Sequence, residues 1–151
     1  MDVHRNAGSL AERMIGTWRL ISRVDRAADG TTRTDPALGS DPLGILTYTR
    51  DRFAAQFMKR DRTDVAAKAA AGSGQNNTSA IGGYDAYFGT YQVGDDGLVR
   101  HRLEAALTPA NVGLEVTRTL AVECDKLTIV LETATQDGEP VTRTLTWDRI
   151  G

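Results

Sequence analysis

The sequence is poor in the residues that build disulfides and metal sites. It has one cysteine, Cys124, which excludes an intramolecular disulfide framework and a cysteine-based zinc site. It has only two histidines, one of them close to the N-terminus, which excludes a multi-histidine metal site. A phosphate-binding loop, a dinucleotide fingerprint and a G-x-S-x-G motif are also missing. We therefore expect a function that needs no metal and no cofactor.

Strong charge and long apolar segments are missing as well. The formal net charge is -2 and the isoelectric point is about 5.7, which argues against a nucleic-acid partner. No apolar run approaches the roughly 20 residues that span a bilayer, and the N-terminal residues lack the apolar core of a secretory signal. We expect a cytoplasmic protein without a membrane partner. A length of 151 residues suits one domain over residues 1–151, and the oligomeric state stays open.

Two neighbouring segments between residues 98 and 122 alternate apolar and polar side chains. His101 shares a face with Leu103, and Arg118 shares a face with Val116. Because successive side chains of a strand point to opposite faces, each segment is predicted to be a half-buried strand. His101 and Arg118 are the polar exceptions on the two apolar faces. An interior that contains two such groups needs an explanation.

The rest of the chain predicts a barrel around that interior. A capping box at Ser9 and Glu12 predicts a short helix over 10–14. The composition of residues 61–83 predicts an insertion that contains a helix. This insertion is either a lid over the barrel mouth or a solvated segment without a function. Sequential hairpins favour an all-β, eight-stranded antiparallel up-and-down barrel, with a two-sheet sandwich as the alternative. The expected strands cover residues 15–24, 44–49, 53–58, 84–93, 98–107, 114–122, 127–132 and 140–150.

Further polar side chains are candidates for the barrel interior. Tyr48 and Gln56 are the polar members of the second and third strands that could face inward. Tyr87 and Tyr91 share one face of the fourth strand. Arg143 has the same parity as the apolar residues of the last strand, so its side chain either enters the lumen or reaches water at the rim. We treat these five as candidate ligand-binding residues.

Gly16-Thr17-Trp18, which follows the short helix and opens the first strand, resembles the G-x-W motif of lipocalins. More narrowly, the chain resembles the bacterial and fungal lipocalin-like domain family. This resemblance implies a barrel with an internal cavity, in which Trp18 plugs the closed end and Arg149 stacks across it. Residues 110–112 depart from the family, where many relatives have an aromatic residue. The resemblance rests further on Gly44–Thr49, on Tyr-x-Gly-x-Tyr at 87–91, and on His101, Pro109, Gly113 and Arg118.

His101 and Arg118 are predicted on adjacent strands, within hydrogen-bond range of each other. An arginine stays charged and suits a carboxylate, enolate or phenolate, while a histidine can move a proton. Each could instead be a structural residue with a partner inside the core. The sequence supports two functions. The first is a barrel that binds a small hydrophobic or aromatic molecule with an acidic oxygen. The alternative is a cofactor-independent isomerase, cyclase or hydro-lyase that acts on a polyketide- or terpenoid-like intermediate, with His101 as acid/base.

Overall fold

The structure is a computed structural model that describes residues 8–62 and 80–151. Most of the insertion predicted over 61–83 lies outside the described residues, so its role as a lid stays a prediction. The nine strands are β1 (Gly16–Arg26), β2 (Thr32–Arg33), β3 (Leu43–Tyr48), β4 (Arg52–Met58), β5 (Tyr84–Val93), β6 (Leu98–Ala106), β7 (Glu115–Glu123), β8 (Lys126–Ala134) and β9 (Pro140–Arg149). The helical turns are α2 (Leu10–Arg13), η1 (Asp95–Gly97) and η2 (Pro109–Asn111).

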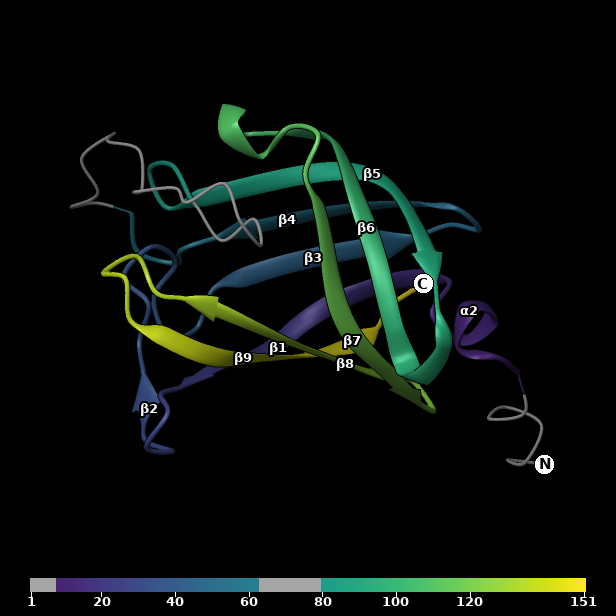
Figure 1. Cartoon of the computed structure of the whole chain (residues 1–151), viewed down its shortest axis with the longest axis horizontal. Helices are drawn as coiled ribbons and strands as arrows, with labels where there is room; N and C mark the ends of the chain where they lie inside the picture. Colours follow the sequence, from purple (N-terminus) through teal and green to yellow (C-terminus); the bar gives the residue numbers. More distant parts are fainter. Residues whose placement is uncertain (1–7, 63–79) are drawn as a thin grey trace.

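The long strands form a closed antiparallel barrel (Figure 1). From β3 to β9 each strand pairs with the next along the chain, and β1 pairs with both β3 and β9. The pairing of β1 with β9 closes the sheet, which confirms the predicted eight-stranded up-and-down barrel and rules out the two-sheet sandwich. The two-residue strand β2 pairs only with the end of β1, so it extends the rim and not the wall.

The two ends of the barrel differ in the connections that they carry. At the end where α2 and the C-terminus lie, tight turns join β3 to β4 and β7 to β8. At the opposite end, where Figure 1 shows β2, residues 27–42, 107–114 and 135–139 connect the strands. We call the two ends the closed end and the mouth.

The closed end is sealed by the N-terminal helix and by the Trp18–Arg149 pair that the family resemblance implied. The capping box is present, with the Glu12 amide donating to Ser9 Oγ at 3.2 Å. The Arg149 guanidinium lies 4.3 Å from the centre of the fully buried Trp18 ring, a contact worth roughly 0.5–2 kcal/mol. Arg149 also donates to the carbonyls of Ile15 and Arg13, each at 2.7 Å. The contact between Arg149 and Trp18 that the resemblance implied is therefore present in the structure.

Gly16 opens β1 because no other residue fits there. Its φ is +142°, in a region that L side chains rarely adopt. A Cβ at this position would lie 2.7 Å from the carbonyl oxygen of Gly151 and would also collide with the Arg149 guanidinium. The glycine of the G-x-W motif therefore allows the arginine to reach the tryptophan.

An irregularity in β1 changes which residues face the lumen. The register with β9 shifts between Leu20 and Ser22. Such a bulge adds one residue to the strand and reverses the alternation beyond it. Without the bulge, alternation from Trp18 would put Arg23 on the outer face, whereas the structure buries both Arg23 and Asp25. The bulge therefore turns Arg23 inward, and β1 contributes charged groups to the interior.

Candidate functional site

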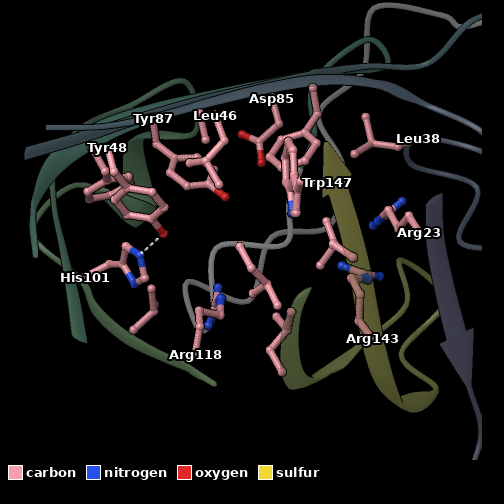
Figure 2. A pocket seen from close by; sticks show the side chains of 17 residues that line it. Arg23, Leu38, Leu46, Tyr48, Asp85, Tyr87, His101, Arg118, Arg143 and Trp147 are labelled. Carbon is pink, nitrogen blue, oxygen red and sulfur yellow. Dashed lines mark hydrogen bonds between the residues drawn. The ribbon is translucent and has the colours of Figure 1, made fainter. Parts of the chain in front are cut away.

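The barrel encloses a cavity whose wall is largely apolar, with aliphatic and aromatic side chains (Figure 2). The space between its lining atoms is about 680 Å³, including the part open to solvent, and the centre of a water molecule can occupy about 60 Å³. A single water needs roughly 10–15 Å³ of the latter volume, so the clear space is small and has room for a few water molecules. The aromatic residues of the wall are Tyr48, Phe53, Phe57, Tyr87 and Trp147.

Tyr48 and His101 form a buried hydrogen-bonded pair in this wall. The Tyr48 hydroxyl lies 2.6 Å from His101 Nε2, and the imidazole packs edge-on against Phe53 with ring centres 4.8 Å apart. Burial and the nearby Arg118 lower the pKa of His101 to about 3, although the backbone at Val99 and Val116 opposes that shift. Burial raises the pKa of Tyr48 well above its usual range. Both side chains are therefore neutral at pH 7.

Arg118 projects from β7 into the same part of the cavity. Its Nη1 donates to the neighbouring Thr117 carbonyl at 3.3 Å. Burial is the main cause of the lowered pKa of Arg118; the positive charge of Arg143 adds to this effect, while Tyr87 and Tyr48 oppose it. We call Tyr48, His101 and Arg118 the deep group, because they lie toward the closed end of the barrel. Tyr48 pairs with Gly16 at that end, and Arg118 pairs with Val99 at the start of β6. The sequence prediction that His101 and Arg118 face one interior is confirmed.

Four charged side chains form a second polar group near the mouth. Arg143 donates to both carboxylate oxygens of Asp25, at 2.8 and 2.9 Å, and to Asp35 at 2.9 Å. Arg23 lies 3.5 Å from Asp35. All four side chains are between 1% and 5% exposed. We call Arg23, Asp25, Asp35 and Arg143 the mouth cluster.

The mouth cluster fixes a loop across the rim. Asp35 accepts hydrogen bonds from the backbone N–H of Ala37 at 3.0 Å and of Gln136 at 3.1 Å. Burial by itself would lower the pKa of Arg143, but hydrogen bonds and attraction to Asp25 and Asp35 raise it overall. The Arg143 side chain points into the barrel, which is one of its two predicted orientations. Its guanidinium does not reach water. Arg143 also lines the cavity, and its role in ligand binding stays a prediction.

Asp85 is a cavity residue that the sequence analysis missed. It is 4% exposed and lines the cavity from the start of β5. Burial raises its pKa to about 7, although the Ala86 backbone N–H and Arg23 act in the opposite direction. The alternation that placed Tyr87 and Tyr91 on one face includes Asp85 when it is extended by one step. That signal was present in the sequence.

Three other candidate residues lie in different places. Tyr87 lines the cavity, as predicted. Gln56 is exposed on the outer face of β4, where its side chain accepts a hydrogen bond from Tyr84, so its inward assignment is wrong. Tyr91 is buried, but its hydroxyl donates to the Thr49 carbonyl at 2.5 Å in a closed-end turn. Tyr91 supports Tyr48, with ring centres 5.0 Å apart, and is not a cavity-lining residue.

Comparison with known proteins identifies the family. A family model described as a lipocalin-like domain matches residues 15–150. The chain belongs to the lipocalin-like domain family. Membership implies small-molecule binding in general, and the largely apolar cavity is consistent with it. No curated protein matches this lipocalin-like chain significantly.

Within 8–62 and 80–151, no group of three or more histidine, cysteine, aspartate or glutamate side chains is arranged to hold a metal ion. In the same part of the chain, no helix has the length and apolar character needed to cross a membrane.

Proposed function

We propose that this lipocalin-like barrel binds a small, flat, mostly apolar molecule, and that an acidic oxygen of the molecule is held at Arg118. The observation that carries this proposal is the buried guanidinium of Arg118 in a cavity whose wall is largely apolar. Burial disfavours the charged form of Arg118, as its lowered pKa shows. A ligand anion beside it would offset that cost, and a charge-assisted hydrogen bond would add affinity.

The rest of the deep group favours the same assignment. Tyr48 and His101 are neutral and hydrogen-bonded to each other, so neither brings a negative charge that would repel an anion. The mouth cluster is a poorer place for an acidic oxygen, because Asp25 already engages Arg143 through both of its carboxylate oxygens. An acidic group is therefore favoured at Arg118, deep in the barrel, over Arg143 at the mouth.

The enzyme alternative assigned proton transfer to His101. With a pKa of about 3, His101 is neutral at pH 7 and has no proton to donate as an imidazolium. The same value makes it a weak base. The site therefore supports binding more strongly than a reaction through His101. The cytoplasmic location inferred from the sequence stays a prediction.

The test uses cinnamate, a flat aromatic carboxylate, and isothermal titration calorimetry at pH 7. We expect Arg118→Met to weaken cinnamate binding roughly 10- to 100-fold, because a hydrogen bond to a charged group contributes about 1.5–3 kcal/mol. The matched control is Arg100→Met, which removes the same charge from the exposed face of β6. Equal affinities for the two variants would overturn the assignment of Arg118.

A further inference from the structure

Two buried polar atoms of the cavity wall take no part in the deep group. Within the described part of the chain, Asp85 Oδ1 and the indole Nε1 of Trp147 have no hydrogen-bond partner. Asp85 is 4% exposed and Trp147 is 1% exposed. A buried polar group without a partner costs roughly 1–3 kcal/mol, so two such atoms in one cavity indicate a place that a polar ligand group completes.

Both residues adjoin Phe57. Asp85 on β5 is the cross-strand partner of Phe57 on β4. The Trp147 ring on β9 packs edge-on against Phe57, with ring centres 5.7 Å apart. Asp85 and Trp147 both line the cavity, and Figure 2 shows both side chains projecting into it. The two orphan atoms therefore belong to one region of the wall.

This region is separate from the deep group along the barrel. Asp85 pairs with the end of β4 near the mouth, whereas Arg118 pairs with Val99 at the start of β6. Figure 2 also shows Arg118 and Asp85 on different sides of the cavity. One elongated ligand can therefore contact both groups at its two ends.

The two atoms differ in hydrogen-bonding capacity. An indole N–H can only donate, while a carboxylate can only accept. A hydroxyl group satisfies both, because its oxygen accepts from Trp147 and its hydrogen goes to Asp85. A second carboxylate on the ligand would be repelled once Asp85 ionises. An ammonium group would leave the indole N–H without an acceptor.

We propose that Asp85 and Trp147 form a second polar subsite, which binds a hydroxyl group at the end of the ligand opposite its acidic oxygen. This inference rests on the proposed function, because Arg118 sets the orientation of the ligand. The ligand class is thus a hydroxylated aromatic acid or a molecule with the same two-ended polarity. Since burial raises the pKa of Asp85 to about 7, both of its protonation states are populated near neutral pH, and either can hydrogen-bond to a hydroxyl.

The first experiment uses the unmodified protein and its two tryptophans. In ¹H–¹⁵N spectra, we expect 4-hydroxycinnamate to shift the indole N–H signal of Trp147 far more than cinnamate does. Trp18 is an internal control, because its indole N–H already donates to the Met14 carbonyl at 2.9 Å and lies at the closed end. Equal shifts of the Trp147 signal with the two acids would overturn the subsite.

The second experiment compares the affinities of the same two acids. We expect the hydroxyl to strengthen binding about five- to tenfold in the unmodified protein, the size of one or two ordinary hydrogen bonds. This advantage, taken as the ratio of the two affinities within each variant, should disappear in Asp85→Leu and in Trp147→Phe. Asp51→Leu, in the exposed turn between β3 and β4, is the matched control and should keep the advantage. A hydroxyl advantage that survives both cavity variants would contradict the proposal.

The results separate this inference from the proposed function. If binding depends on Arg118 but the hydroxyl adds nothing, the subsite alone is wrong. If the hydroxyl advantage depends on Asp85 and Trp147 but Arg118→Met has no effect, the subsite stands and the anchor at Arg118 is wrong. If neither acid binds the unmodified protein, both proposals are overturned.

Discussion

The mouth cluster and the deep group place the same residue type in opposite situations. Arg143 in the mouth cluster is held by the carboxylates of Asp25 and Asp35, which raise its pKa. Arg118 in the deep group faces the cavity beside two neutral side chains, and burial lowers its pKa. Both guanidiniums are almost fully buried. The difference lies in their partners and not in their burial.

This difference indicates that Arg143 supports the fold, and it agrees with the proposal that Arg118 binds the acidic oxygen of a ligand. A buried ion pair is costly to break, because removal of one partner leaves the other charge buried and uncompensated. A buried cation in a cavity gains from an incoming anion instead. The comparison therefore predicts that substitutions in the mouth cluster change stability, whereas substitutions in the deep group change binding.

The largest expected effect is that of Arg143→Met on stability. This change leaves Asp25 and Asp35 in the interior without their main cation, so we expect the free energy of unfolding to fall by roughly 3–5 kcal/mol. Urea denaturation followed by circular dichroism measures it. A loss below about 1 kcal/mol, the range of an exposed pair, would show that the mouth cluster does not hold the rim.

The second largest expected effect is that of Asp85 on the pH dependence of the unfolding free energy. The unfolded carboxyl ionises near pH 3.8, while the folded one stays protonated until about pH 7. Between these values the unfolded state binds fewer protons, so stability falls as pH rises and then levels off above pH 7. The pKa difference corresponds to a cost of roughly 4 kcal/mol. The unfolding free energy of Asp85→Asn, relative to the unmodified protein, should rise by an amount of that order between pH 4 and pH 8.

The electrostatic surroundings of Asp85 define how this measurement is interpreted. The other titratable groups around the cavity are the same in the unmodified protein and in Asp85→Asn. The difference between the two unfolding free energies therefore isolates the contribution of Asp85. A difference that is constant with pH would mean that the carboxyl is already ionised in the folded protein at pH 4. The titratable groups that line the cavity with Asp85 are Arg23, Tyr48, Tyr87, His101, Arg118 and Arg143.

Arg118→Met sharpens the comparison with Arg143→Met. Since burial already disfavours the charge of Arg118, we expect its removal to leave the free energy of unfolding unchanged or to raise it by about 1 kcal/mol. The same urea titration measures both variants side by side. A destabilisation as large as that of Arg143→Met would place Arg118 among the structural residues.

His101 gives the smallest expected effect. Its pKa of about 3 keeps the ring neutral from pH 8 to pH 5, so its imidazole NMR signals should not move over that range. His101→Gln should weaken cinnamate binding by no more than about fivefold, because one neutral hydrogen bond is worth about 1 kcal/mol or less here. A titration midpoint near pH 6.5 would reopen an acid/base role for His101.

The sequence predicted most of the fold because alternation and turn signals are local. The barrel strands lie close to their expected bounds, and Trp18 and Arg149 pair as the family resemblance implied. Face assignment failed where the local pattern is ambiguous. In β4 both faces carry apolar residues, so Gln56 could not be oriented, and the bulge after Leu20 reversed the position of Arg23.

The partners of buried charges could not be predicted, because they are distant along the chain. Arg143 and Arg118 occur in similar alternating segments. What sets Arg143 apart is its contacts to Asp25 and Asp35, which lie more than 100 positions before it in the chain. Asp85 was visible as a member of the inward face of β5, but its raised pKa depends on burial in the closed barrel. Tyr91 was correctly placed inside, while its hydroxyl contact at Thr49 depends on the tertiary fold.

A crystal structure of the protein with bound 4-hydroxycinnamate tests the central claim most directly. We expect the acid inside the barrel, with its carboxylate hydrogen-bonded to the Arg118 guanidinium and its hydroxyl between Asp85 and the Trp147 indole. A carboxylate bound at Arg143 in the mouth cluster, or a ligand bound outside the barrel, would contradict the assignment of the deep group as the binding site.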